Sequence, residues 1–419
     1  MKDMFDLIVV GGGFAGTAAA ISAARQGVDV LLIERYNCLG GAASMALVTP
    51  FMRYWQTDPN TKEKWFLSGD LFCEIVAEVK KLPGEDDSIE QFDEEHLKLV
   101  LNRMAVKAGV TLLFNTTVTD VSVTDGVIRS VTAMSKATSV ELFARHFIDA
   151  TGDAELATLA GCASTVGRAQ DGLCQPMTLC FRMGGVDRQI FWEHRGELQT
   201  LYKEHKAKGL IRNPREDVLY FWNSHEGVLH FNTTRVVKLD PTDPFALTQA
   251  EIEAREQVFE MQDFLRKNVP GFEQARVLST AMHIGIRESR KVEGEYTLTQ
   301  EDLLSLARFE DAIAVADYDI DIHNPEGSGT SHHLFKAGEW YEIPYRCLLP
   351  KGMHNLLVAG RCISATHEAQ ASFRIMPYCA ELGQAAGTAV AVASATGKSV
   401  RDVDVQVVRR RLRGNHFRI

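Results

Sequence analysis

The hydrophobic pattern near the start of the chain predicts a strand, a helix and a second strand, in that order. Residues 6–10 contain a short apolar run that is typical of a buried strand. Residues 17–25 are rich in alanine and predict a helix, which Gly27 can end. Residues 28–33 form a second apolar run, so the stretch has the pattern of two buried strands joined by a helix.

The next part of the chain, up to Gly161, has both helical and strand-like periodicity. Apolar positions three and four residues apart predict helices at 65–81 and 92–108. Asp125-Gly126 is a typical hairpin turn between two strands. Strands are predicted at 110–115, 117–123, 127–134 and 142–148.

The composition changes after Gly161, where aromatic and charged residues become more frequent. Within residues 162–345 we predict strands at 179–184, 219–222 and 228–233 and a helix at 247–268. The remaining chain again contains apolar runs of the kind that form buried elements. It predicts a strand at 355–361, a polar loop at 362–377, a helix of small residues at 378–395 and a last helix at 403–413 with Asp402 as its N-cap.

The glycines between the first strand and helix indicate a dinucleotide site. Gly11, Gly13 and Gly16 have G-x-G-x-x-G spacing. In such a motif the glycines permit a tight turn, close approach to a pyrophosphate and close packing of helix on strand. Glu34 ends the second strand 18 positions after Gly16, where an acid can bind a ribose hydroxyl. The complete order of these parts makes a ligand-free glycine turn a poor alternative.

Two further glycine segments fit the same ligand. Gly40-Gly41 follows soon after Glu34, and we favour contact with a cofactor over a simple surface turn. Ala150-Thr151-Gly152 ends the strand at 142–148 and returns the chain to the nucleotide edge of a sheet. Near the other end of the chain, Ala359-Gly360-Arg361 ends a strand in the same way.

These motifs resemble the glutathione-reductase-like FAD superfamily, and in detail a broad bacterial group of FAD-dependent oxidoreductases. The segments 287–290 (Arg-Glu-Ser-Arg), 344–346 (Pro-Tyr-Arg) and 366–369 (Thr-His-Glu-Ala) add to the likeness, which covers nearly the whole chain. The resemblance implies FAD as the cofactor. It implies FAD contacts at Gly11, Gly13, Phe14, Ala15, Gly16, Glu34, Arg35, Gly40, Gly41, Ala42, Ser44, Val118, Ala150, Thr151, Gly152, Gly360 and Arg361.

The resemblance also implies the fold. We expect an α/β protein with a Rossmann-like FAD-binding domain, in which a parallel sheet carries a three-stranded β-meander. That domain would be discontinuous and comprise residues 1–161 and 346–419. An inserted α+β substrate domain, residues 162–345, would cover the cofactor.

Four residues are candidates for the chemistry. His367 is the first choice for proton transfer, because its segment should pass the flavin and histidine titrates near neutral pH. Arg287, Glu288 and Arg374 are candidates for anchoring a substrate carboxylate or polyol, although a buried ion-pair network would explain the Arg-Glu-Ser-Arg segment equally well. Three histidines, 323, 332 and 333, lack convincing ligand partners, so no metal is expected.

The favoured function is hydride transfer between flavin N5 and a small polar organic substrate, such as an alcohol, sugar or amine. Alternatives are a reductase of C=C or C=O bonds, a monooxygenase, and a redox-neutral or structural use of FAD. The glycine–aspartate–proline signature of many hydroxylases is missing. There is no second dinucleotide fingerprint, so NAD(P)H or an electron-carrier protein would dock only transiently.

Charge and composition narrow the partners. The chain has 419 residues and a net charge of −10, which argues against nucleic-acid binding. No apolar run approaches the roughly 20 residues that span a bilayer, and no export signal is evident, so we expect a cytoplasmic enzyme without a membrane anchor. The eight cysteines are scattered, without a C-x-x-C pair. A homo-oligomer is expected on base rates alone.

Overall fold

A five-stranded parallel sheet forms the centre of the larger part of the protein. The computed structural model describes residues 4–58, 61–67, 70–85, 88 and 90–413. The sheet has the strand order β20-β9-β1-β2-β5, and all four neighbouring pairs are parallel. Its strands are β1 (Phe5–Val10), β2 (Val30–Ile33), β5 (Thr111–Leu113), β9 (Ala144–Asp149) and β20 (Leu356–Val358). The predicted Rossmann-like α/β class is confirmed.

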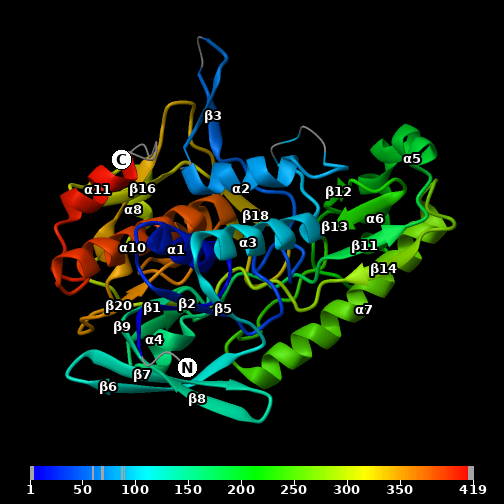
Figure 1. Ribbon diagram of the computed structural model, residues 1–419. Coiled ribbons are helices and arrows are strands. Elements are labelled where there is room, and N and C mark those ends of the chain that lie inside the picture. Colours follow the sequence, from blue (N-terminus) through cyan, green and yellow to red (C-terminus); the bar gives the residue numbers. More distant parts are fainter. Residues whose placement is uncertain (1–3, 59–60, 68–69, 86–87, 89, 414–419) are drawn as a thin grey trace.

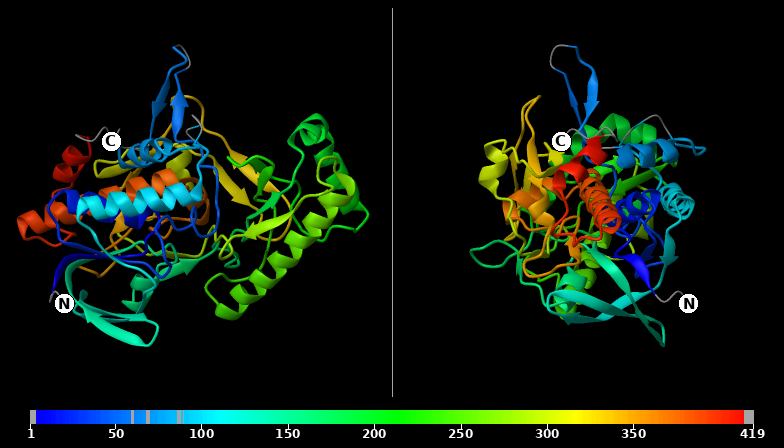
Figure 2. Two further views of the ribbon diagram at one scale, coloured as in Figure 1. Left: turned by 45° about the vertical axis from the view of Figure 1, so that its right-hand side comes forward. Right: turned by 60° about the vertical axis from the view of Figure 1, so that its left-hand side comes forward.

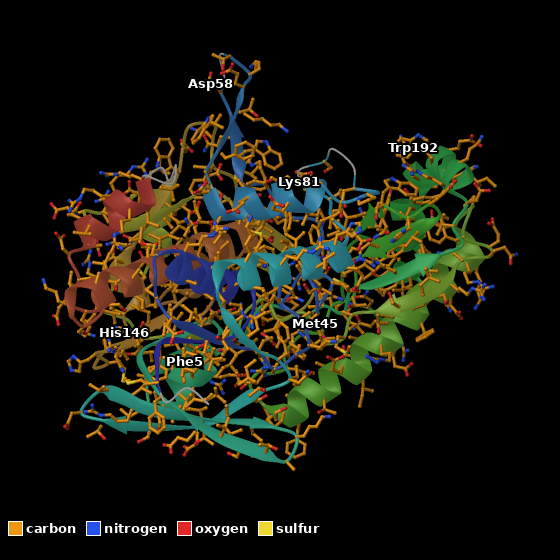
Figure 3. All side chains as sticks on the ribbon, viewed as in Figure 1. Phe5, Met45, Asp58, Lys81, His146 and Trp192 are labelled. Carbon is orange, nitrogen blue, oxygen red and sulfur yellow. The ribbon has the colours of Figure 1, made fainter. Side chains whose placement is uncertain are left out.

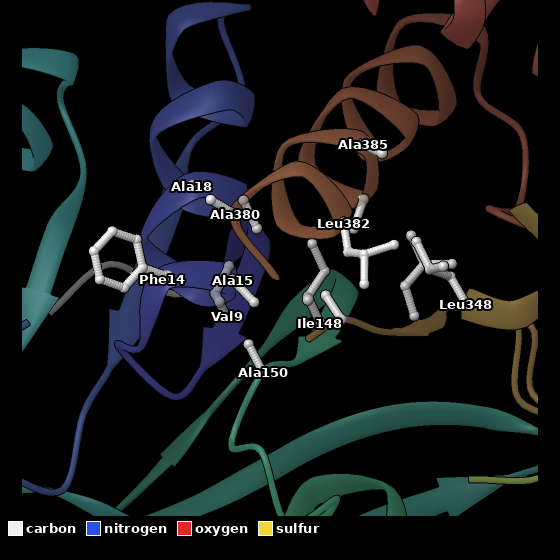
Figure 4. Close-up of a cluster of buried hydrophobic side chains, with 14 of the residues drawn as sticks. Val9, Phe14, Ala15, Ala18, Ile148, Ala150, Leu348, Ala380, Leu382 and Ala385 are labelled. Atoms are coloured by element: carbon white, nitrogen blue, oxygen red, sulfur yellow. The ribbon is translucent and has the colours of Figure 1, made fainter. Parts of the chain in front are cut away.

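Helices α1 (Phe14–Arg25) and α10 (Met376–Thr396) pack together on one face of this sheet. Small side chains allow the close approach, because α1 and α10 are both rich in alanine and glycine. A Cβ atom added at Gly383 would lie 2.6 Å from the carbonyl carbon of Ala15. Figure 4 shows Ala15 and Ala18 of α1 beside Ala380 of α10, above Ile148 of the sheet.

The remaining elements of this part complete its layers. A β-meander covers the opposite side of the sheet (Figure 1), and α3 begins where the Asp93 side chain accepts a hydrogen bond from the Glu95 N–H. Gly109 ends α3 in a left-handed conformation. These elements are the meander strands β6 (Thr117–Thr124), β7 (Val127–Ser135) and β8 (Thr138–Leu142), with α2 (Asp70–Lys80), α3 (Glu94–Ala108), α4 (Glu155–Leu159) and α11 (Val405–Arg413).

A second unit forms a lobe beside the first (Figure 2). Its antiparallel sheet has the order β12-β13-β11-β14 and carries the long helix α7, while Trp192 of α5 lies at its far end (Figure 3). The Asp243 side chain caps α7, and Pro244 occupies its first turn. The elements are β11 (Phe181–Gly184), α5 (Arg188–His194), a 3₁₀ helix (Arg195–Glu197), α6 (Leu198–Ala207), β12 (Tyr220–Trp222), β13 (Val228–Phe231), α7 (Pro244–Asn268) and β14 (Arg276–Thr280).

The hydrophobic core of the second unit comes from a shorter stretch of the chain than residues 162–345, the segment expected for a substrate domain. It is built from residues 177–284 together with Leu47. Apolar residues between 292 and 345 belong instead to the core of the larger part. Those residues lie in or near β10 (Ser164–Val166), β15 (Arg290–Val292), α8 (Gln300–Leu304), β16 (Ala312–Ala316), β17 (Ile320–His323), β18 (Thr330–His333), β19 (Tyr341–Pro344) and a 3₁₀ helix (Tyr345–Leu348).

Three predicted elements differ from the structure. Trp65 belongs to a hairpin of β3 (Trp55–Thr57) and β4 (Lys64–Phe66), so the helix expected at 65–81 is described only from Asp70, and residues 68–69 lie outside the described residues. The loop expected at 362–377 contains α9 (His367–Phe373), which Thr366 caps through the Ala369 N–H. At α11 the Asp404 side chain, not Asp402, accepts a hydrogen bond from the Gln406 N–H.

His230 predicts how the stability of the second unit depends on pH. Its side chain is buried on β13, and neither ring nitrogen has a hydrogen-bond partner among the described residues. Burial, with the nearby charge of Arg182, lowers the pKa of His230 from 6.5 to about 3. Below pH 6.5 the unfolded chain therefore binds a proton that the folded chain excludes, and stability falls by up to about 1.4 kcal/mol per pH unit.

The substitution His230→Phe should remove this proton uptake and flatten the dependence. Urea unfolding at several pH values between 4 and 8 measures the free energy of unfolding directly. An unchanged slope between pH 6.5 and 4 in the variant would show that His230 is not kept neutral by the fold.

Candidate functional site

One cavity of about 830 Å³ lies between the carboxyl edge of the parallel sheet and the second unit. Gly11 after β1, Ala150 after β9 and Ala359 after β20 all line it. Thr178 and Asn232 line it from the second unit. Ligands of open α/β sheets bind at this edge, where neighbouring connections leave in different directions.

The glycine loop at the end of β1 is shaped by very close backbone packing. Gly11 has a φ of +100°, and a Cβ atom there would lie 2.5 Å from the carbonyl oxygen of Ala150. A Cβ atom at Gly16 would overlap the carbonyl oxygen of Gly11. Gly13 differs, because the nearest atom to a Cβ there is the Cα of Gly41, 4.0 Å away. The fold therefore needs Gly11 and Gly16, whereas the space beside Gly13 is left open.

Helix α1 begins directly after this open space. Its N-cap is Gly13, no side chain caps it, and its first turn has no acidic residue. The free N–H groups and the helix dipole favour an anion there. Gly13, Phe14 and Ala15 line the cavity at this point, facing Gly40, Gly41 and Ala42 of the second glycine segment.

Glu34 is buried beside the loop and lines the same cavity. One of its carboxylate oxygens accepts a hydrogen bond from the Gly12 N–H at 2.5 Å, and the other accepts from the Tyr36 N–H at 2.9 Å. Each oxygen has a further lone pair, so the carboxylate can also accept a hydroxyl of a ligand. The sequence prediction placed Glu34 in this role.

The structure brings nearly all predicted cofactor residues to the cavity. Arg35 pairs with Glu155, and Arg361 pairs with Asp153 at 2.5 Å. Two predicted residues do not line the cavity. Gly16 packs against Gly11, and the Ser44 hydroxyl donates to the carbonyl of Leu39 at 2.7 Å. The predicted cofactor residues that do line it are Gly11, Gly13, Phe14, Ala15, Glu34, Arg35, Gly40, Gly41, Ala42, Val118, Ala150, Thr151, Gly152, Gly360 and Arg361.

His367 and Glu288 lie outside the cavity lining. The His367 Nδ1 is 2.7 Å from one Glu288 oxygen, and the Lys291 ammonium is 2.6 Å from the other. All three side chains are buried. Although burial raises the pKa of Glu288, the hydrogen bond to His367 and the charge of Lys291 hold it below its ordinary value. His367 thus belongs to a buried hydrogen-bonded cluster, and proton transfer by His367 stays a prediction.

Arg287 and Arg374, the other two predicted residues, both line the cavity. Arg374 pairs with Asp321 at 3.1 Å. Arg287 donates to the carbonyl oxygen of Pro176 and the hydroxyl of Thr178, both at 2.7 Å. Burial, with the charges of Arg374 and Arg215, lowers the pKa of Arg287 to about 9, so its guanidinium remains charged at neutral pH.

The sequence interpretation missed several polar residues that line the cavity, among them Arg215, Asn232 and Tyr318. They come from three parts of the chain that are far apart in the sequence. Their separations follow no motif or periodicity that would have predicted a shared site. Asp321 and His323 also line it, and the sequence analysis considered His323 only as a metal ligand. Among the described residues, no three histidine, cysteine or carboxylate side chains are grouped to hold a metal ion.

His323 is a hydrogen-bonding residue in this structure. Its Nδ1 lies 3.0 Å from an Arg235 nitrogen, and its Nε2 lies 3.4 Å from Asp321. Burial and the charge of Arg287 lower the pKa of His323 to about 3, so the ring is neutral and can accept from Arg235. The ring thus links the β17–β18 hairpin to the second unit.

A model of the FAD dependent oxidoreductase family matches residues 6–412. The chain belongs to this family. Its cofactor is therefore FAD, and the open space at Gly13, the uncapped start of α1 and the buried acid Glu34 fit a dinucleotide. Within the described part of this family member, no helix combines the length and apolarity that a bilayer span requires.

Two relatives each match part of the chain. Digeranylgeranylglycerophospholipid reductase of Methanocella arvoryzae is 30% identical over 188 residues, which cover 40% of this chain and 42% of the relative. Protein FixC of Escherichia coli is 54% identical over 39 residues, 9% of each protein. The matches thus span less than half the length of these relatives.

Solved structures resemble the chain over nearly its whole length. The p-nitrophenol 4-monooxygenase PnpA from Pseudomonas putida has a TM-score of 0.50 and 12% identity, with 96% of this chain and 83% of that chain covered. At this identity the likeness shows the fold alone.

Proposed function

We propose that this FAD-dependent oxidoreductase transfers a hydride between a small polar organic substrate, such as an alcohol, sugar or amine, and flavin N5. One observation carries the proposal: the cavity lined by the glycine loops and Glu34 is also lined by Arg287 and Arg374. Cofactor-type and substrate-type groups therefore share one cavity, which direct transfer requires.

Bound FAD would supply the redox chemistry, and the chain would supply position and charge. We propose that Gly11, Gly13 and the start of α1 hold the pyrophosphate and that Glu34 accepts a ribose hydroxyl. The N-terminus of α10 lies at the cavity through Ile375 and Met376, without a capping side chain or an acid in its first turn. Its dipole would favour negative charge on the flavin ring.

We infer that the cofactor half has the glutathione-reductase-like arrangement. The sequential order of the glycine segments and the position of the meander support this inference. The unit built from residues 177–284 is our candidate substrate domain, in place of the longer segment 162–345. His367 and Glu288 would act indirectly, because Gln370 of the same helix donates a hydrogen bond to the Arg287 carbonyl at 2.9 Å and Glu288 directly follows Arg287.

A second candidate is a reductase that receives electrons from NAD(P)H or a carrier protein and reduces a C=C or C=O bond. The Methanocella arvoryzae relative is named a reductase, and this name favours the second candidate for the segment that the two chains share. The charged lining at Arg215, Arg287 and Arg374 suits a small polar molecule better than a long apolar one, so we rank this candidate second.

Anaerobic reduction of the bound flavin separates the two candidates. We expect that NADH and NADPH leave the blue absorption band of the purified holoprotein unchanged, whereas one compound of an alcohol, sugar, amine and hydroxy acid panel bleaches it. Photoreduction is the control that the flavin is competent. Rapid bleaching by either nicotinamide would instead support the reductase, and failure of every organic compound and both nicotinamides would favour a carrier protein as the reductant.

A further inference from the structure

The polar lining around Arg287 has an unbalanced charge. Four other arginines of the cavity pair with carboxylates: Arg35 with Glu155, Arg361 with Asp153, Arg215 with Asp217 at 2.8 Å, and Arg374 with Asp321 at 3.1 Å. Arg290 also lines the cavity, and among the described residues its guanidinium contacts the backbone carbonyl oxygen of Asp153 and no carboxylate. Among the described residues, no carboxylate lies within 4.0 Å of the Arg287 guanidinium. Its close acceptors are neutral oxygens, so the positive charge of Arg287 has no counter-ion within that distance.

Two acids of the lining, Glu216 and Asp321, pair with basic residues other than Arg287. Glu216 pairs with Arg235 at 3.0 Å and also accepts hydrogen bonds from the Gly329 N–H and the Thr330 hydroxyl. Asp321 is held by Arg374 and His323. A substrate would therefore meet, in Arg287, a guanidinium that has no carboxylate within ion-pair distance among the described residues.

The guanidinium of Arg287 is fixed in position but still has donor capacity. Nη1 makes both short hydrogen bonds, to Pro176 and Thr178, which hold the group in place. Nη2 makes only a 3.5 Å contact with the Asn232 side-chain oxygen. An anionic oxygen would be a much better acceptor for Nη2, because charge-assisted hydrogen bonds are shorter and stronger.

Neutral donors accompany Arg287 on the cavity wall. Asn232 and Tyr318 both line the cavity, and burial raises the pKa of Tyr318, so its hydroxyl stays protonated and can donate. One positive charge with two neutral donors matches a monoanion better than a dianion. A carboxylate has one negative charge and a planar pair of oxygens that fits a guanidinium.

We propose that the substrate is a small monocarboxylate whose carboxylate group binds Arg287, with Asn232 and Tyr318 as accessory donors. The proposal rests on the proposed function for the rest of the substrate, which would carry the oxidisable carbon. It narrows the substrate class from polar molecules in general to hydroxy acids, amino acids and related carboxylates. Phosphate shares the oxyanion chemistry and is the alternative that the experiment distinguishes.

The test uses the holoprotein and unreactive anions. Acetate, propionate and benzoate are titrated while the visible flavin spectrum is followed, with inorganic phosphate and the neutral amides benzamide and propionamide as comparisons. We expect saturable spectral shifts with the carboxylates, weaker shifts with phosphate and none with the amides. Binding of phosphate at least as tight as that of every carboxylate would overturn the assignment of a monocarboxylate.

Substitutions of Arg287 test whether the carboxylates bind at this residue. Arg287→Met should weaken carboxylate binding about 30-fold, the loss expected for a charge-assisted hydrogen bond of about 2 kcal/mol. Arg287→Lys should restore part of it, because the charge remains. Arg212→Met is the matched control, since Arg212 is an exposed residue of the same unit that does not line the cavity. Equal affinity in Arg287→Met and wild type, with flavin retained, would overturn the proposal.

The two proposals can fail separately. If no carboxylate perturbs the flavin while a neutral alcohol or sugar reduces it, the carboxylate site is wrong and hydride transfer from a polar substrate stands. If carboxylates bind through Arg287 but no organic compound reduces the flavin, the carboxylate site stands and the proposed direction of electron flow is wrong. Should Arg287→Met not fold, Asn232→Leu and Tyr318→Phe test the same site, each with weaker carboxylate binding expected.

Discussion

The substitution Gly13→Val should yield a folded protein that no longer retains FAD. Gly13 has a φ of −65° and a ψ of −176°, a conformation open to all residues, and its Cβ position has no atom closer than the Gly41 Cα at 4.0 Å. The protein itself therefore accommodates a side chain there. A dinucleotide does not, because the valine would fill the space that the pyrophosphate needs at the start of α1.

We expect FAD affinity to fall about 100-fold. The steric overlap between the valine and the pyrophosphate costs about 3 kcal/mol, and it exists only in the FAD-bound protein. The ratio of flavin to protein absorption after purification, followed by titration of the apoprotein with FAD, measures it. Gly196→Val is the control, because Gly196 has open space around its Cβ position and lies in the second unit, away from the cavity. A Gly13→Val protein that purifies yellow and binds FAD like the control would rule out the assigned pyrophosphate position.

The nucleotide half could be predicted because its information is contiguous in the chain. Gly11, Gly13, Gly16 and Glu34 lie within one strand–helix–strand unit. Gly11 and Gly16 have a steric reason at their positions and Glu34 a hydrogen-bonding one, whereas Gly13 leaves space open. Local sequence therefore fixes local geometry. The boundaries of the elements moved by a few residues, as where α1 begins at Phe14 instead of Thr17.

The substrate end could not be predicted in the same way. Arg215, Asn232 and Tyr318 line one cavity with Arg287, although their separations in the chain follow no period. The dense polar segment around Arg287 predicts its place in a binding site. It does not predict that Arg287 lacks an acidic partner. That property depends on where every nearby carboxylate points.

The segment around His367 differs from its predicted local structure. A polar segment between a strand end and a helix was interpreted as a loop that presents its histidine to the flavin. The segment instead forms α9, with Thr366 as its cap, and the helix directs His367 to the buried Glu288. The Glu288 and Lys291 partners lie far away in the chain, so the sequence contains no local sign of them.

The substitution Gly383→Ala should destabilise the protein by about 3 kcal/mol or more, although alanine favours a helix by about 1 kcal/mol over glycine. The added methyl would lie 2.6 Å from the carbonyl carbon of Ala15, and backbone atoms cannot rotate away as a side chain can. Helices α1 and α10 would have to separate. Because Ala15 lines the cavity, the displacement should weaken FAD binding as well.

Urea unfolding of the apoproteins measures the stability loss without the contribution of bound FAD. Gly387→Ala is the matched control, because its methyl would meet the Ala19 backbone one turn further from the glycine loop. We expect similar destabilisation in the two variants but a smaller loss of FAD affinity in Gly387→Ala, since Ala19 does not line the cavity. Equal stability of Gly383→Ala and wild type would mean that the two helices are not held at contact distance. Equal FAD affinity in the two variants would mean that their spacing does not position the cofactor loop.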